Sequence, residues 1–205
     1  CGHDSHTAIL LGAARYLAET RNFAGKVHLI FQPAEEGLGG ARRMVAEGLF
    51  ERFPCDEIYG MHNDPTSPAG QVRLKPGAAM AGATFFDLVV KGTGAHAAMP
   101  HQGQDPIIVA TALVQQLQTI VSRNRPPAVP LVFSVTQIHA GSAYNVVPNT
   151  ATISGTIRYF SDEARDMTHQ RVRELCAGMA TAYGVEIEVD LRNVFDVLMN
   201  DPELG

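Results

Sequence analysis

The residues best suited to chemistry are a thiol, imidazoles and carboxylates that stand beside expected strand ends in the first third of the chain. Cys1 and His3 come directly before the first expected helix. Glu35 and Glu36 follow a short apolar run that is typical of a strand, and His62 ends the next such run. In open α/β sheets, ligands bind beyond the carboxyl ends of the strands, so we expect these side chains to converge on one edge. Thiolate, imidazole and carboxylate groups are suitable ligands for zinc or a similar divalent ion.

The two adjacent glutamates indicate hydrolytic chemistry. In an extended or irregular backbone, neighbouring side chains point in different directions. One carboxylate can therefore coordinate a metal ion while the other faces a metal-bound water, whose pKa the ion lowers to roughly 7. The free carboxylate then takes the proton of that water. A Glu-Glu pair alone is usually solvated surface and Cys-x-His alone is a short motif, but their coincidence at three successive strand ends favours a metal site.

The elements that must position these residues alternate between helix and strand. Apolar residues at helical spacing predict a helix over 6–20, with Asp4 and Ser5 as candidate N-caps. Apolar runs predict strands over 27–31 and 57–61, with a second helix between them over 41–50. This order is typical of an α/β layer with a mainly parallel sheet.

From about residue 83 the expected order becomes strand, helix, strand, strand, helix, strand. The expected strands cover 85–90, 131–138, 150–160 and 185–191, and the expected helices cover 107–122 and 162–183. This is the β-α-β-β-α-β order of the ferredoxin-like, or split βαβ, fold. The sequence therefore predicts two α/β domains with a boundary near residues 80–84.

Composition narrows the function classes. The chain has 205 residues, of which 45% are hydrophobic and 18% are charged, and this excludes a disordered polyelectrolyte. No run approaches the roughly 18 apolar residues of a membrane span, so we expect no membrane partner. A net charge of −5 argues against nucleic acid as a partner, because nucleic-acid binders normally show a basic face. Three cysteines are too few for a disulfide framework, and we expect a reducing, cytoplasmic location.

Five motifs carry a resemblance to a known family. They read CGHDSHT (1–7), QPAEEG (32–37), GMHN (60–63), GTGAHAAMPH (92–101) and NVVPN (145–149). In this order and with similar gaps, they resemble the dinuclear metal-dependent amidohydrolases and metallopeptidases of the hippurate hydrolase and N-acyl-amino-acid amidohydrolase type, which are related to aminoacylase and carboxypeptidase-like zinc peptidases. The resemblance covers nearly the whole chain. It implies hydrolysis of an amide bond in N-acyl-amino acids or small peptides, with two divalent ions per intact site, drawn from Zn, Mn, Co or Ni.

The resemblance also implies roles for the residues of the first domain. The implied metal ligands are Cys1, His3, Glu36 and His62, with the Cys1 thiolate bridging two ions. Glu35 resembles the general acid/base that activates the water. His6, inside the first expected helix, is expected to support these ligands or to serve the fold. On this view residues 1–82 form a partial metal-binding catalytic domain.

The second domain, residues 83–193, resembles the lid of the family, which also forms the interface of a homodimer. His96 resembles the imidazole that reaches the reacting carbonyl oxygen, often from the partner subunit, and such a donor stabilises the charge of the transition state. Asn145 resembles a residue that contacts the substrate. Arg158, on an expected strand, could hold a substrate carboxylate through a bidentate contact or could pair with a neighbouring acid. Residues 194–205 are expected to return to the catalytic domain.

The sequence departs from the family pattern in two larger respects. The family carries an N-terminal segment with the first strands of the sheet and a further metal-binding His near its C-terminus, and neither is found here. The four ligands present do not close a two-metal site. We therefore expect a piece of a longer protein, cut inside its catalytic domain, whose parent hydrolyses amides while this chain alone lacks an intact site. Ser5 stands where family members usually have Gly or Ala.

Two other function classes stay open. If proteolytic maturation exposes Cys1, its α-amine, with a pKa of roughly 8, could activate the thiol as in N-terminal nucleophile hydrolases. Those enzymes are usually built from two stacked antiparallel sheets, unlike the alternating order seen here. The third class is a non-catalytic dimerisation module, because a ferredoxin-like domain offers an edge strand and an exposed helical face.

Overall fold

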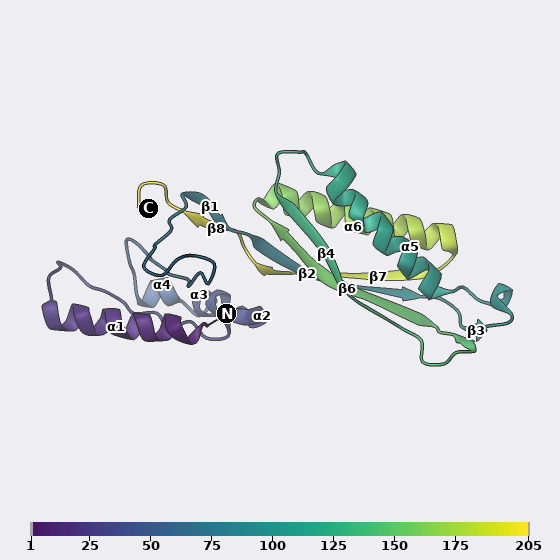
Figure 1. The fold of residues 1–205 in the computed structure, drawn as a ribbon, viewed down its shortest axis with the longest axis horizontal. Helices are drawn as coiled ribbons and strands as arrows, with labels where there is room; N and C mark the ends of the chain where they lie inside the picture. The colour runs from purple at the N-terminus through teal and green to yellow at the C-terminus, as the bar shows by residue number, and fades with distance from the viewer. Residues whose placement is uncertain (1, 205) are drawn as a thin grey trace. The chain divides into compact units, whose positions relative to one another are not determined.

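The computed structural model describes residues 2–204 and divides the chain into two compact units, Cys1–Arg73 and Leu74–Gly205. The first unit contains four short or medium helices, which Figure 1 labels α1 (Asp4–Thr20), α2 (Glu35–Leu38), α3 (Gly40–Ala46) and α4 (Leu49–Arg52). The second unit contains all the strands of the described residues. None of the helices within residues 2–204 combines the length and the hydrophobicity that a membrane span requires.

The two strands expected in the first unit are not formed. Segments 27–31 and 57–61 have no strand assignment and no ladder partner among residues 2–204. A strand exists only where a neighbouring segment accepts and donates its hydrogen bonds, and an apolar run by itself does not supply that neighbour. The three sheets of the described chain pair antiparallel throughout, so the prediction of a mainly parallel sheet is wrong for these residues.

The helices of the first unit also begin and end differently from the prediction. α1 begins at Asp4, and His3 occupies the N-cap position without a side-chain cap. Ser5 lies inside the first turn, where its hydroxyl donates to the carbonyl of Gly2 at 2.6 Å, so Ser5 does not act as an N-cap. The helix expected over 41–50 is divided into α3 and α4, because Gly48 between them takes a left-handed conformation.

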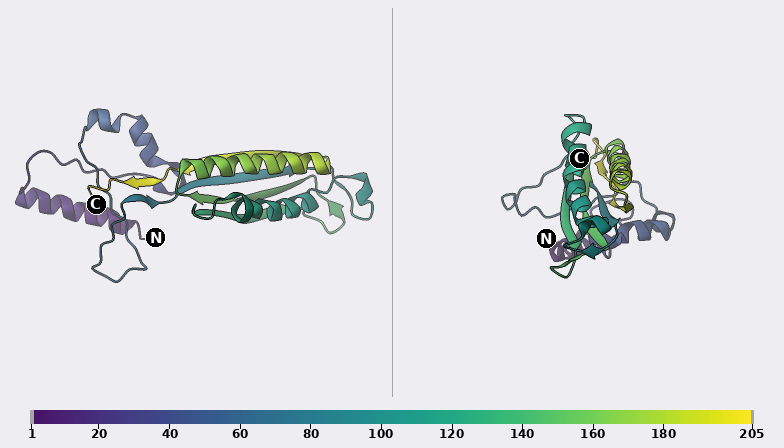
Figure 2. Two further views of the ribbon diagram at one scale, coloured as in Figure 1. Left: turned by 90° about the horizontal axis from the view of Figure 1, so that it is seen from above. Right: turned by 90° about the vertical axis from the view of Figure 1, so that its right-hand side faces the viewer.

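The second unit is built on a four-stranded antiparallel sheet with the order β4-β6-β2-β7. The strands of this sheet and the two helices between them are, in chain order, β2 (Gly82–Lys91), α5 (Pro106–Thr119), β4 (Leu131–Ala140), β6 (Thr150–Tyr159), α6 (Asp162–Tyr183) and β7 (Glu186–Phe195). This is the β-α-β-β-α-β order expected from the sequence. Both helices cover the same face of the sheet (Figure 1), and α6 runs along its length (Figure 2). A π-helical turn, η2 (Ile120–Asn124), continues α5.

Two small sheets and one short helix complete the second unit. β1 (Gly77–Met80) pairs with β8 (Leu198–Asn200), and β3 (Ala95–His96) pairs with β5 (Val146–Val147). A 3-10 helix, η1 (Pro100–Gln102), follows β3. The β3–β5 pair joins the segment of His96 to the segment that follows Asn145.

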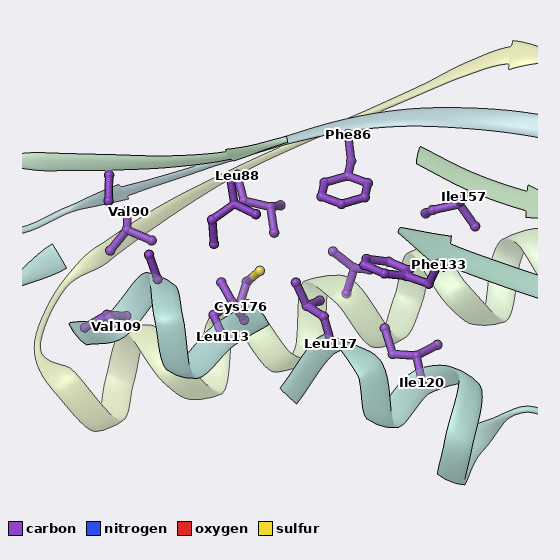
Figure 3. Close-up of a cluster of buried hydrophobic side chains, with 14 of the residues drawn as sticks. Phe86, Leu88, Val90, Val109, Leu113, Leu117, Ile120, Phe133, Ile157 and Cys176 are labelled. Carbon is purple, nitrogen blue, oxygen red and sulfur yellow. The ribbon is translucent and has the colours of Figure 1, made fainter. Parts of the chain in front are cut away.

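The core of the second unit lies between its sheet and its two helices (Figure 3). Phe86, Leu88 and Val90 alternate along β2 and are at most 1% exposed, as expected for the buried face of a strand. Leu113 and Leu117, four residues apart on α5, form the matching apolar stripe. The N-terminus of α5 is capped by Asp105, whose carboxylate accepts the N–H of Ile107 at 2.8 Å, and that of α6 is capped by Ser161, which accepts the N–H of Ala164 at 3.2 Å.

A half-buried histidine borders this core. Nε2 of His169 on α6 lies 2.9 Å from Oγ1 of Thr84, a fully buried residue of β2. Burial lowers the pKa of His169, the positive charges of Arg173 and Arg165 lower it further, and the charge of Asp166 acts in the opposite direction. The folded chain therefore favours the neutral imidazole.

This shift predicts a stability change with pH. The unfolded chain keeps the ordinary His pKa of 6.5, so it takes up the proton first as the pH falls through that value, and the folded state loses stability. We expect the free energy of unfolding to fall between about one pH unit above 6.5 and about one unit below it, and to fall more for the wild-type chain than for His169→Gln. Urea titrations at the two pH values measure both free energies. The glutamine keeps a hydrogen-bonding group for Thr84 but does not titrate. Equal pH dependence of the two proteins would contradict this account.

Candidate metal centre

Three of the expected site residues of the first unit converge beside the start of α1. Nδ1 of His3 lies 3.6 Å from Oε2 of Glu35 and 3.4 Å from Oε1 of Glu36. One donor atom from each of the three residues lies within 4.8 Å of the others. The two segments that supply them are more than thirty positions apart in the sequence. Their convergence is therefore a tertiary feature.

The backbone of the loop that carries the two glutamates has an unusual conformation that few residue types can adopt. Ala34 takes a left-handed conformation, with φ 49° and ψ 47°, and Glu36 has a non-helical ψ of 96°, so α2 is irregular. The N–H of Gly40 donates to the carbonyl of Ala34 at 3.3 Å and closes the loop. A Cβ at position 40 would lie 1.7 Å from the carbonyl oxygen of Pro33, so only glycine fits there. This path allows two consecutive carboxylates to reach the same imidazole.

His62 lies beside the same imidazole. The centroids of the His3 and His62 rings are 5.3 Å apart in an edge-on arrangement. Nδ1 of His62 lies 2.7 Å from the carbonyl oxygen of Asn63, which can only accept, so in the neutral ring Nδ1 carries the proton and Nε2 has the lone pair. A hydrogen bond from the second ring nitrogen to a carbonyl is the usual support of a metal-ligating histidine. His62 is adjacent to the His3, Glu35 and Glu36 cluster without being one of its three donors.

These donors fit a divalent metal ion. Imidazole nitrogen and carboxylate oxygen suit Zn, Mn, Co and Ni. If His3 and one glutamate bind the ion, the carboxylate of the other glutamate stays free. The side chains of His3, Glu35 and Glu36 are 33%, 49% and 72% exposed, so an ion and a substrate could both reach them. Cys1, the remaining expected ligand, lies outside the described residues, and its roles stay predictions.

In the second unit, the β3–β5 pair brings His96 and Asn145 together. His96 pairs with Val146, and the N–H of Ala97 donates to the carbonyl of Asn145 at 3.0 Å. Nδ1 of His96 accepts the N–H of Ala98 at 3.1 Å, so in the neutral ring the proton lies on Nε2. The exposed His96 side chain thus presents a hydrogen-bond donor, which is what stabilisation of a carbonyl oxygen requires.

Arg158 lies on β6 and is half-buried. Its guanidinium donates to the hydroxyl of Thr156 and, at 3.4 Å, to the carbonyl of Ile157. Within residues 2–204, Arg158 forms none of the ion pairs observed. Its expected contact with a substrate carboxylate stays a prediction.

Sequence reasoning gave no role to Asn63, although the residue stands next to His62 in one of the motifs. In the structure its backbone contacts both His62 and His6, and its side chain contacts His6. For His6 a signal was available, because it follows His3 by three positions at the start of a helix, a spacing that places two side chains on one face. No periodic pattern identifies Asn63.

Comparison with known proteins identifies the class. Residues 1–204 match peptidase family M20/M25/M40, and the chain belongs to this family, as the motifs predicted. It is 43% identical over 203 residues to hippurate hydrolase of Campylobacter jejuni, covering 99% of this chain and 53% of that protein. It is 42% identical over 202 residues to N-acetyl-L-cysteine deacetylase of Bacillus subtilis, covering 98% of this chain and 48% of that protein.

A solved structure supports the same assignment. A Bacillus subtilis peptidase of the M20 family, described as dinuclear metal binding, superimposes on the chain with a TM-score of 0.76 at 34% identity. The alignment covers 98% of this chain and 51% of that one. The chain therefore spans about half the length of the relatives it matches. These relatives are hydrolases or deacetylases by name.

Removal of His3 tests whether the cluster binds metal. We expect His3→Ala, made in the full-length protein, to weaken the affinity for Zn²⁺ by more than about tenfold, because the imidazole is the only described donor that touches both carboxylates. Isothermal titration of the metal-free protein measures this affinity. His28→Ala is the matched control, since the His28 ring packs edge-on against Phe53 instead of against the cluster. Equal affinity of His3→Ala and wild type would contradict the assignment.

Proposed function

We propose that the protein to which this chain belongs hydrolyses the amide bond of N-acyl-amino acids or small peptides, with a divalent metal ion and with Glu35 as general acid/base. One observation carries the proposal: a second carboxylate stands next to a His3–Glu36 donor pair, in a chain of the M20/M25/M40 family. Two relatives support the substrate class, because hippurate and N-acetylcysteine are both N-acyl amino acids.

The first unit would hold the metal. In the proposal His3, Glu36 and His62 are ligands, together with Cys1, and two ions bind in the complete site. A divalent ion held there would supply Lewis-acid chemistry, which lowers the pKa of water to about 7 and polarises a carbonyl group. Zn, Mn, Co and Ni all suit these donors.

Glu35 would move the proton. Its carboxylate accepts a proton from the attacking water and returns it to the amide nitrogen, which then leaves as an amine. In the structure Oε2 of Glu35 lies 3.6 Å from the His3 ring, and its side chain is about half exposed, so it is open to a water. A second proton carrier is not required for this cycle.

Residues of the second unit would bind and orient the substrate. The Nε2–H of His96 donates to the carbonyl oxygen as negative charge develops on it. Asn145, held beside it through the β3–β5 pair, contacts the substrate, and Arg158 holds the free carboxylate of the amino acid through a bidentate contact.

Replacement of Glu35 tests the mechanism. Glu35→Gln keeps the size of the side chain but removes its ability to accept a proton. In the full-length protein we expect the kcat for N-acetyl- and N-benzoyl-amino acids to fall by about 10²–10⁴, with the bound metal unchanged. Glu47→Gln is the control, because Glu47 is paired with Arg43 on the next helix, away from the His3 contact. Hydrolysis that survives both Glu35→Gln and exhaustive chelation would refute the proposal.

We further propose that residues 83–193 act as a lid and dimerisation domain, with residues 1–82 and 194–205 in the catalytic domain. β4 and β7 support this, because each has one strand neighbour in the sheet of the described chain and so presents a free edge.

Sedimentation of the full-length protein tests the dimer. We expect the mass of a homodimer at micromolar concentrations, since an edge strand can pair with its copy across a two-fold axis. A strict monomer at tens of micromolar would contradict the prediction. A dimer that neither binds metal nor hydrolyses these substrates would instead favour the non-catalytic dimerisation module.

A further inference from the structure

A third imidazole belongs to the candidate metal centre. The His6 ring is stacked on that of His3, with centroids 5.2 Å apart and planes 27° apart. The same ring meets His62 edge-on at a centroid distance of 4.5 Å. His6 therefore contacts both expected imidazole ligands, although it is not one of the three clustered donors.

The Nε2 atom of His6 is already engaged by Asn63. The backbone N–H of Asn63 points to this nitrogen at 3.0 Å, and Oδ1 of the Asn63 side chain lies 2.8 Å from it. A neutral ring nitrogen carries either a lone pair or a proton. With a lone pair it accepts from the backbone N–H, and with a proton it donates to Oδ1. In both tautomers Asn63 occupies Nε2, and neither ring nitrogen of His6 belongs to the group of clustered donor atoms.

Asn63 also contacts His62 and lies against Gly2, the residue before His3. Its carbonyl oxygen accepts from Nδ1 of His62, as described above. Its side-chain amide lies against Gly2, where a Cβ would come within 2.9 Å of Nδ2 and where φ is +70°. Glycine at position 2 therefore lets Asn63 approach the segment that precedes His3.

Within residues 2–204, core packing does not hold these rings in place. α1 has no buried residue, and His62 itself is exposed. Where packing does not fix a rotamer, hydrogen bonds to neighbouring groups must do so if the ligands are to keep a productive geometry. The described contacts that can do this for His6 and His62 are those of Asn63.

We propose that His6 and Asn63 form a positioning pair that sets the orientation of the His3 and His62 imidazoles for metal binding, and that His6 is not itself a ligand. The pair joins residues 57 positions apart, so it also fixes the segment of His62 against the start of α1. The inference rests on the proposed function and deepens it, because it assigns residues that act through the ligands.

Four variants of the full-length protein separate the hydrogen bond from the ring. His6→Phe keeps an aromatic ring but cannot bond to Asn63, and His6→Gln keeps a hydrogen-bonding group but loses the ring. Asn63→Ala removes Oδ1 and retains the backbone contacts. His28→Gln is the control, a histidine of the same unit that packs on Phe53.

Two readouts besides activity follow the site: the affinity for Co²⁺ and the visible absorption spectrum of the bound cobalt. We expect His6→Phe and Asn63→Ala to weaken the affinity by about 10–100-fold and to alter the spectrum. We expect His6→Gln to bind within a few-fold of wild type. A fifth protein that combines His6→Phe with Asn63→Ala should bind Co²⁺ no more weakly than the worse of these two single variants, because both changes remove the same contact.

Several results would overturn the inference. Wild-type affinity and spectrum in both His6→Phe and Asn63→Ala would show that the pair does not position the ligands. A loss of affinity in His6→Gln with wild-type affinity in His6→Phe would show that the packing of the ring, and not its hydrogen bond to Asn63, orients the ligands. If His6→Phe loses its far-ultraviolet circular dichroism, Asn63→Ala and His6→Gln decide the question. A wild-type protein that binds no divalent ion would refute the proposed function itself, whereas wild-type binding with unaffected variants refutes this inference alone.

Discussion

The contact of one imidazole with two consecutive carboxylates is the interaction on which the candidate centre depends. Two acidic groups that share a site repel each other unless positive charge lies nearby. At Glu35 and Glu36 the repulsion is moderated by water, since the two side chains are 49% and 72% exposed. The arrangement therefore concentrates negative charge at one point of the surface without burying it. Such a concentration of negative charge suits a divalent cation. The backbone conformation from Pro33 to Gly40 places the two carboxylates side by side and so produces it.

The second unit was largely predictable from the sequence because its elements are held by a repetitive apolar pattern. Phe86, Leu88 and Val90 alternate with period two, and Leu113 and Leu117 repeat at helical spacing, so each element showed which face it buries. The prediction was less accurate at the strand ends: β2 and β4 extend beyond the expected 85–90 and 131–138, and the short strands β1, β3, β5 and β8 were not predicted. β7 continues to Phe195, beyond the expected 191, because its pairing with β2 extends to Ala83 and the hydroxyl of Tyr159 donates to Asn193.

The first unit was less predictable, for two physical reasons. The run over 27–31 resembles a buried strand, yet Val27, Leu29 and Phe31 are 42–49% exposed, since strand formation depends on a neighbour that the run itself does not reveal. The convergence of His3, Glu35 and Glu36 could be predicted from the sequence, but the pair of His6 and Asn63 could not. Their contact links single residues through hydrogen bonds, and such a link leaves no period in the sequence.

Ala34 has a consequence for any attempt to make this protein more robust. A left-handed alanine costs roughly 1 kcal/mol relative to a glycine, and this one stands directly before the two carboxylates. Directed selection for thermal tolerance would favour glycine at such a position for the folded state. This gain in the stability of the folded state would be offset, because glycine also increases the conformational entropy of the unfolded chain. Glycine would also make the loop more flexible. The backbone strain at Ala34 thus illustrates a compromise between the stability of the fold and a rigid arrangement of the two carboxylates.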